Sequence, residues 1–228
     1  MFDAFTLVAA TADLADEPAA RGVADLVEFR MDMAESPLEQ LARYDGDLPL
    51  LVTNRPTWEG GEADPGTGRL DALKAAVGNE HVAAVDIELA ALRRGGDLGD
   101  AAAEVVTEAE ALDVSVVVSV HDFQGTPSER AMASLLTAAA ELGDVGKLAV
   151  TAEHRTDALS LLSATHAADA TGERVATMAM GEAGQHTRAV APVYGSRIGY
   201  APVDAADATA PGQYDLETLA RLVDDLGA

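Results

Sequence analysis

Eight short runs of β-forming residues alternate with helical patterns along the chain, and this alternation limits the fold more than any other feature. The runs lie at residues 5–11, 26–32, 48–55, 82–89, 115–121, 145–150, 174–180 and 193–199. A helical pattern follows each run, at residues 18–23, 36–44, 70–77, 100–112, 126–142, 156–168, 185–189 and 215–226. Strands that alternate with helices favour a parallel sheet covered by helices. Eight such units in 228 residues predict a (β/α)8 TIM barrel that spans residues 1–228 as a single domain.

A doubly wound parallel sheet is the alternative fold. That fold usually carries a glycine-rich phosphate loop after its first strand. Here the first strand runs into Thr11-Ala12-Asp13-Leu14, which contains no glycine. The barrel is therefore the better prediction.

Polar residues recur at every second position in four of the predicted strands. Parallel strands covered by helices are usually almost wholly apolar, so these positions need an explanation. They are Glu28, Arg30 and Asp32; Asp86 and Glu88; Ser119 and His121; and Lys147 and Thr151. Because side chains alternate between the two faces of a strand, and the other face is apolar in each case, the polar face must point into the barrel.

These polar residues crowd toward the carboxyl ends of their strands, where barrels of this class hold their active sites. Arg55 also ends its strand. A structural ion pair, such as Asp86 with Arg30, explains any single carboxylate in the set. Ionisable groups from four strands at one mouth of the barrel instead indicate a site for a small polar anion.

Lys147 is the one amine among these residues. The chain contains two lysines, and the other, Lys74, lies in a helical pattern that lets it turn toward water. Lys147 alternates with Leu148 and Val150 and so faces the barrel interior. An amine in a desolvated position loses its charge readily and then attacks carbonyl groups. Lys147 is a candidate Schiff-base lysine; the alternative is a lysine that only pairs with a carboxylate.

The formal net charge is −24, from 39 acidic and 15 basic residues. Nucleic acids and anionic membranes need a positive protein surface, so neither is expected as a partner. Such a charge strains a compact protein by self-repulsion. Concentrated salt relieves the strain, because the Debye length falls to about 3 Å at 1 M. We interpret the charge as a halophilic adaptation to the solvent.

Several classes of site are absent from the sequence. The chain has no cysteine, which excludes disulfides, thiolate metal sites and a cysteine nucleophile. The histidines show no metal-ligand spacing, so no metal site is expected.

The start of the chain has no basic segment before an apolar one, and no apolar run is long enough to cross a bilayer. A cytoplasmic protein is the expectation.

Motif-like stretches in a fixed order cover nearly the whole chain. They are Glu28-Phe29-Arg30-Met31-Asp32, residues 54–61, residues 85–89, Ser119-Val120-His121-Asp122-Phe123, residues 180–184 with Arg188, and Ala210-Pro211-Gly212-Gln213. In this order they resemble the type I 3-dehydroquinate dehydratases of the shikimate pathway. The resemblance implies a lyase that converts 3-dehydroquinate into 3-dehydroshikimate through a Schiff base, with no metal or cofactor. It also implies a homodimer.

The resemblance gives roles to individual residues. Lys147 would form the imine with the substrate ketone, His121 would act as general acid and base, and Glu59 would orient His121. The substrate-binding residues fall into three groups: Arg188, Thr209 and Gln213 for the carboxylate end; Glu28, Arg30 and Arg55 for the ring hydroxyls and nearby charge; and Met178 and Met180 as walls for the ring.

Three positions depart from the family pattern. The family often has serine where this chain has Ala9 and Thr209, and often phenylalanine at the place of Tyr194. Thr209 keeps a hydroxyl, whereas Ala9 loses one, so we expect at most weaker substrate binding from Ala9.

Two other functions fit part of the pattern. One is another Schiff-base aldolase-type barrel, which would need a phosphate site after strands seven and eight, near Gly195-Ser196-Arg197. The other is a non-catalytic barrel that binds polar small molecules, in which Lys147 only neutralises a carboxylate.

The charge predicts a strong dependence of stability on salt. With a net charge of −24, dilution from molar to millimolar salt removes the screening between surface carboxylates. We expect the melting temperature, followed by circular dichroism, to fall substantially over this range. A melting temperature that stays constant would contradict the interpretation of the charge.

Overall fold

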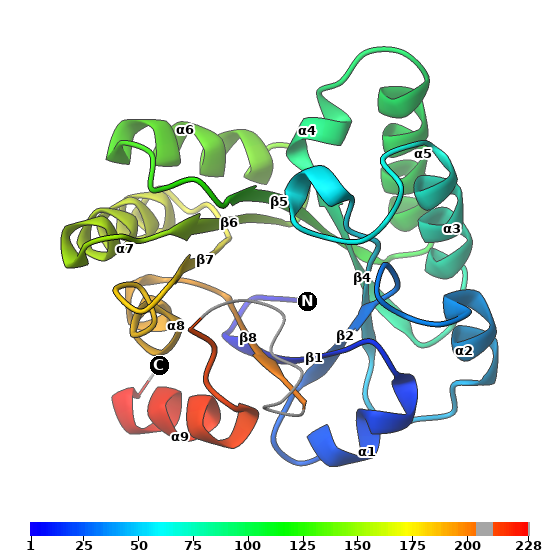
Figure 1. Ribbon diagram of the computed structural model, residues 1–228, viewed down its shortest axis with the longest axis horizontal. Coiled ribbons are helices and arrows are strands. Elements are labelled where there is room, and N and C mark those ends of the chain that lie inside the picture. Colours follow the sequence, from blue (N-terminus) through cyan, green and yellow to red (C-terminus); the bar gives the residue numbers. More distant parts are fainter. Residues whose placement is uncertain (204–211, 228) are drawn as a thin grey trace.

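The computed structural model describes residues 1–203 and 212–227, and there eight parallel strands form a nearly closed barrel with helices around the outside (Figure 1). The strands are β1 Thr6–Thr11, β2 Leu26–Arg30, β3 Leu50–Thr53, β4 Val82–Glu88, β5 Ser115–Asp122, β6 Val145–Thr151, β7 Val175–Met180 and β8 Ile198–Pro202. They are hydrogen-bonded in the order β7-β6-β5-β4-β3-β2-β1-β8. The predicted (β/α)8 fold is confirmed.

A helix or helical turn follows each strand. The α-helices are α1 Glu17–Ala20, α2 Pro37–Arg43, α3 Gly68–Val77, α4 Leu89–Leu92, α5 Asp97–Ala111, α6 Glu129–Ala140, α7 Arg155–Ala170, α8 Thr187–Val190 and α9 Leu216–Leu226. The 3-10 turns are η1 Leu14–Asp16, η2 Thr57–Glu59 and η3 Ala191–Tyr194. Side chains cap some helix starts, as where Ser128 accepts a hydrogen bond from the backbone of Ala131 at α6. None of the helices in the described part of the chain is long and apolar enough to cross a membrane.

The two faces of the strands separate apolar from polar residues as the alternation predicts. In β2, Val27 and Phe29 belong to the core between the barrel and its helices, whereas Glu28 and Arg30 line a pocket inside the barrel. The strands β4, β5 and β6 divide in the same way. One sequence pattern therefore builds the hydrophobic core and lines the interior.

The amino-terminal half of the barrel interior is filled with apolar side chains. Phe2 is 3% exposed and packs there with Val8, Leu26, Leu51 and their neighbours. Figure 1 shows the N-terminus near the centre of the ring of strands. Because this half is filled, the polar interior is confined to the carboxyl-terminal half.

The eighth strand starts later than its sequence suggested. We expected it at 193–199, but residues 191–194 form η3 and β8 runs from Ile198 to Pro202. Pro192 has a fixed φ that suits a helical turn, and Gly195, with a φ of 102°, ends it in the left-handed region. The barrel closes beyond this turn, where the backbone N–H of Arg197 donates to Val175 O at 2.7 Å.

The fold predicts that Gly146, next to Lys147 in β6, tolerates no side chain. A Cβ at Gly146 would lie 2.8 Å from Leu136 O and 2.9 Å from Ala140 N, which are backbone atoms of α6. Gly146→Ala should lower the free energy of unfolding by about 1–3 kcal/mol, since either β6 or α6 must shift. Gly95→Ala is the matched control, because no atom lies within 4 Å of its Cβ. Equal stabilities of the two variants in a denaturant titration would contradict this packing.

Candidate active site

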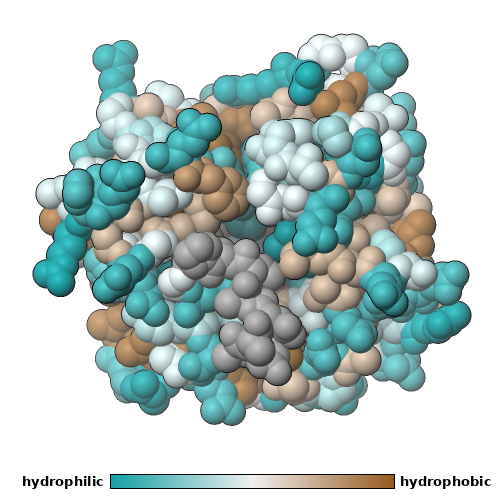
Figure 2. Space-filling model, in the orientation of Figure 1, coloured by the Kyte–Doolittle hydropathy of each residue, from teal (hydrophilic) through white to brown (hydrophobic). Residues whose placement is uncertain are grey.

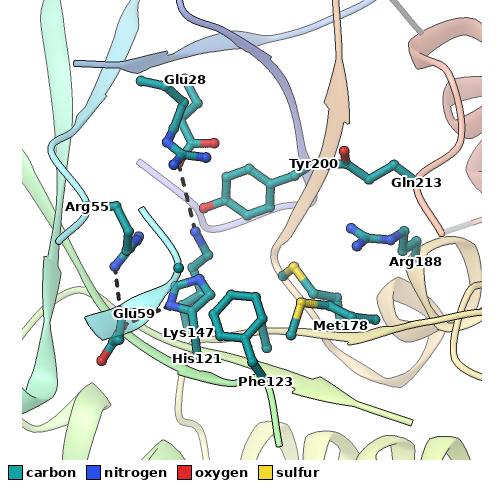
Figure 3. Close-up of a pocket in the computed structure, with 14 residues that line it drawn as sticks. Glu28, Arg55, Glu59, His121, Phe123, Lys147, Met178, Arg188, Tyr200 and Gln213 are labelled. Carbon is teal, nitrogen blue, oxygen red and sulfur yellow. Dashed lines mark hydrogen bonds and ion pairs between the residues drawn. The ribbon is translucent and has the colours of Figure 1, made fainter. Parts of the chain in front are cut away.

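A pocket opens at the carboxyl-terminal end of the barrel, and its walls hold most of the residues singled out from the sequence (Figure 3). Its lining residues are Glu28, Arg30, Arg55, Glu59, Gly60, His121, Phe123, Lys147, Ala149, Met178, Met180, Arg188, Tyr200 and Gln213. Ten of the eleven predicted site residues are in this set. The eleventh, Thr209, lies outside the described residues.

Lys147 lies at the bottom of the pocket and is 4% exposed. Its Nζ is 2.9 Å from Asp86 Oδ2 and 3.9 Å from Glu28 Oε1. The suggested pairing of Asp86 with Arg30 is wrong, because Arg30 pairs with Asp32 at 2.7 Å and Asp86 pairs with Arg55 at 2.8 Å. Lys74 does point outward, to Glu104. Only one of the two lysines is thus in the pocket.

Arg55 ties the carboxylates beneath the pocket together. Its guanidinium contacts Asp86 at 2.8 Å and Glu88 at 3.1 Å, and donates to Ser119 Oγ at 2.6 Å. Burial alone would raise the pKa of Asp86, but Arg55 and Lys147 outweigh it and hold this pKa well below its usual range. Asp86 is therefore a fixed negative charge beside Lys147.

His121, which is partly buried, and Glu59, which is buried, form a pair at the side of the pocket. His121 Nδ1 lies 3.0 Å from Glu59 Oε2. Burial raises the pKa of Glu59 to about 8, and burial together with the charges of Arg55 and Lys147 lowers the pKa of His121 well below its usual value. Both shifts favour neutral side chains. With Nδ1 engaged by Glu59, Nε2 of His121 is left for proton transfer.

Strand register brings His121 close to Lys147. On the adjacent strands β5 and β6, Ser119 is paired with Lys147, and His121 is paired with Ala149. His121 is therefore one inward-facing position nearer the mouth than the amine. A small ligand bound to the Lys147 nitrogen would lie beside the imidazole.

Two glycines let the loop after β3 hold Glu59 in place. Gly60 has a φ of 76° and ends the η2 turn. A Cβ at Gly60 would overlap the ring of Phe123, and a Cβ at Gly61 would overlap the backbone carbonyl of Arg55. Because neither clash arises with glycine, the loop packs directly on the barrel and brings Glu59 to His121.

Arg188 is the basic residue on the opposite wall, near Met178 and Gln213 (Figure 3). Its side chain is buried, yet among the described residues no carboxylate pairs with it and its Nε has no hydrogen-bond partner. Burial lowers the pKa of Arg188 to about 10, and the group stays positive at neutral pH. A buried cation without a counter-ion in the described part of the chain marks where an anionic ligand would bind.

The sequence did not identify every pocket residue. The sequence pattern placed the eighth strand at 193–199, which leaves Tyr200 outside it. Tyr194, the tyrosine inside that range, lies on η3 and is 40% exposed. Phe123 was read only as part of a motif, although its ring stacks on His121 with centroids 6.3 Å apart. The alternation in β8, with Ile198 and Tyr200 on one face, is the signal that would have found Tyr200. Among residues 1–203 and 212–227, no group of three or more potential ligands is arranged to hold a metal ion.

Comparisons with known proteins point to one family. The family described as Type I 3-dehydroquinase matches residues 5–227. The chain is 60% identical to the 3-dehydroquinate dehydratase of Haloarcula marismortui, covering 99% of this chain and 97% of the relative. It is 54% identical to the enzyme of Halobacterium salinarum, covering 99% of both chains.

Solved structures give the same result. The structure is similar to 3-dehydroquinate dehydratase from Geobacillus kaustophilus, with a TM-score of 0.84 and 27% identity over 99% of this chain and 92% of that one. It is equally similar to the type I enzyme of Clostridium difficile with covalently modified comenic acid, with a TM-score of 0.84 and 27% identity over 98% of this chain and 92% of that one.

The raised pKa of Glu59 predicts a pH-dependent effect of its replacement. Its pKa is about 8 in the folded protein and close to 4 in the unfolded chain. The protonated side chain of Glu59 therefore makes its full contribution to stability below the pKa of the unfolded chain. This contribution is lost as the pH rises toward the folded-state pKa of about 8. The stability of Glu59→Gln minus that of the wild type should increase by about 2–4 kcal/mol between pH 4.5 and 8.

Denaturant titrations at several pH values measure this difference. Glu62→Gln, which removes an exposed carboxylate from the same loop, controls for the loss of one negative charge. Parallel pH profiles for Glu59→Gln and the wild type would show that Glu59 is not held in its neutral form.

Proposed function

Because the chain belongs to the type I 3-dehydroquinase family, we propose that its Lys147 forms the imine on which 3-dehydroquinate loses water. The activity is that of a 3-dehydroquinate dehydratase, a hydro-lyase of the shikimate pathway, and the type I reaction proceeds through a Schiff base. The assignment of individual residues to this reaction is our proposal. The observation that carries it is the amine of Lys147 in the pocket, beside His121 and opposite Arg188, which has no carboxylate partner in residues 1–203 and 212–227.

Imine formation comes first. After Lys147 gives up one proton, its Nζ attacks the C3 ketone carbon of the substrate, and the carbinolamine that results loses the ketone oxygen as water, which carries that proton away. The product is a positively charged iminium, which withdraws electrons better than the ketone does. Asp86, 2.9 Å from Nζ, remains a carboxylate and stabilises this positive charge throughout.

His121 then moves the proton. Its neutral imidazole takes the proton from C2, and the electron pair of the broken C–H bond forms the enamine C2=C3. The enamine expels the C1 hydroxyl, which accepts the proton from His121 and departs as water. Hydrolysis of the product imine releases 3-dehydroshikimate and restores the amine. One water is lost overall, and His121 returns to its starting state.

The walls of the pocket orient the substrate for these steps. The buried guanidinium of Arg188, with Gln213 beside it in Figure 3, would bind the substrate carboxylate. For Thr209, which lies outside the described residues, only the family resemblance implies a role at the carboxylate end. Met178 and Met180 would contact the ring from one side. Glu28 and Arg30 would meet the ring hydroxyls. Because Arg55 is already held by Asp86 and Glu88, its role is chiefly to fix those carboxylates.

The alternative of an aldolase-type barrel needs a phosphate site after strands seven and eight, and the side chains there give it little support. Ser196 Oγ accepts a hydrogen bond from the backbone N–H of Thr177 at 2.9 Å. Arg197 pairs with Asp169 at 2.8 Å and also donates to Asp3 O. Both side chains are thus engaged in closing the barrel, which leaves neither for a phosphate.

Assembly and location remain proposals. The net charge of −24 argues against nucleic acid as a partner. Figure 2 shows hydrophilic residues spread around the rim of one face, with hydrophobic residues among them. The family resemblance supports a homodimer, which sedimentation in concentrated salt would test. A cytoplasmic location fits a biosynthetic enzyme.

Turnover of 3-dehydroquinate in concentrated salt tests the assignment of Lys147. The conjugated product absorbs in the ultraviolet, so formation of 3-dehydroshikimate is followed directly. Lys147→Arg keeps the positive charge but cannot form the imine, and we expect it to lose nearly all turnover while retaining substrate binding. Lys74→Arg changes the exposed lysine and should be as active as the wild type. An active Lys147→Arg enzyme would refute the assignment.

His121 should affect the rate in a different way. His121→Ala keeps the amine, so the imine should still form, but proton transfer should slow by about 10²- to 10⁴-fold or more because the histidine acts in more than one step. Single-turnover kinetics with mass detection of the imine separates the two events. Near-normal turnover would place the general base elsewhere, and Glu59 would be the next candidate.

A further inference from the structure

Tyr200 is a buried pocket residue to which the steps above give no role. It lies on β8 and is 5% exposed. The Nζ of Lys147 lies 4.1 Å from the centre of its ring. Its hydroxyl is buried and has no hydrogen-bond partner among the residues that the structure describes.

An unpaired buried hydroxyl is unfavourable. Such a group costs part of its hydration free energy unless it finds a partner, and a phenylalanine of the same shape would avoid that cost. Buried tyrosine hydroxyls therefore usually have partners. The hydroxyl of Tyr200 lacks one in the part of the chain that the structure describes, but it lies in the pocket proposed to bind a polar substrate, so the substrate is the natural partner.

The surroundings of Tyr200 define what its hydroxyl can do. Figure 3 shows the hydroxyl end of the ring pointing toward Lys147 and Glu28, away from Arg188 and Gln213. Burial, together with the charges of Glu28 and Asp86, raises the pKa of Tyr200 well above its usual value. The phenol is therefore protonated at neutral pH and is able to donate a hydrogen bond.

We infer that Tyr200 contacts the substrate, with its hydroxyl donating to the ring hydroxyl next to the imine carbon and its ring facing the imine nitrogen. This inference rests on the proposed function. Of the two ring carbons that flank the imine carbon, C2 carries only hydrogens and C4 carries a hydroxyl. With the carboxylate end held on the Arg188 side, the C4 hydroxyl is the polar group that stays beside the Lys147 nitrogen.

The ring of Tyr200 has a separate effect from its hydroxyl. An aromatic face close to a cation attracts it, and the attraction is stronger when water is excluded. The nitrogen of Lys147 is positively charged as an iminium and neutral in the enamine. The ring therefore favours the iminium state that draws electrons from C2. The hydroxyl contributes to binding, whereas the ring contributes to the intermediate.

Two variants of Tyr200 separate these contributions. Tyr200→Phe removes only the hydroxyl and should raise KM for 3-dehydroquinate by about 5- to 15-fold with kcat within about twofold of the wild type. Tyr200→Leu also removes the ring and should lower kcat by a further 10- to 30-fold or so. Tyr194→Phe is the matched control, because it removes a tyrosine hydroxyl from the exposed η3 turn.

Stability distinguishes a substrate contact from a structural role. Because the hydroxyl has no partner among the described residues, the ligand-free Tyr200→Phe protein should melt at the wild-type temperature or above it. An unchanged KM of Tyr200→Phe would overturn the inference, whatever its melting temperature. A kcat of Tyr200→Leu equal to that of Tyr200→Phe would overturn the role of the ring. Absence of turnover in the wild type would instead refute the proposed function.

Discussion

The site depends on two ion pairs of one carboxylate. Asp86 contacts both of the buried cations Arg55 and Lys147. Buried charges are tolerated only when they are paired, and the loss of one member leaves the others uncompensated at a cost of about 3–5 kcal/mol. Asp86 holds the amine in the barrel and keeps its own negative charge at any working pH. The same contact that makes a buried lysine tolerable thus prepares it to carry the positive charge of an imine.

The barrel separates stability from chemistry along its axis. Apolar side chains, with Phe2 among them, fill the amino-terminal half, and the ionisable groups occupy the carboxyl-terminal half. Each strand contributes to both functions, since its outward residues pack against helices. Gly60 and Gly61 allow the loop after β3 to approach the barrel closely enough for Glu59 to reach His121. The rigid strands place His121 and Lys147, and this loop supplies the group that orients the histidine.

The eight alternating strand and helix patterns were sufficient to predict the barrel. Period-2 alternation was sufficient to predict the inward position of Lys147, His121 and Glu28, because the face of a strand depends only on sequence parity. The partners of these residues could not be predicted. Which side chains meet across the interior depends on the stagger of eight strands, so Asp86 pairs with Arg55 and Lys147 instead of Arg30. Tyr200 was missed for a local reason, the helical turn that Pro192 imposes before β8. The fold followed from repeated sequence patterns, whereas the pairings depend on the three-dimensional arrangement of the strands.

Borohydride reduction in the presence of 3-dehydroquinate tests the central claim most directly. It converts an imine into a stable secondary amine, and the chain offers only Lys74 and Lys147 for modification, so peptide mapping by mass spectrometry assigns the product without ambiguity. We predict that the whole adduct is found on Lys147. An adduct on Lys74, or no adduct on an enzyme that turns over, would contradict the account.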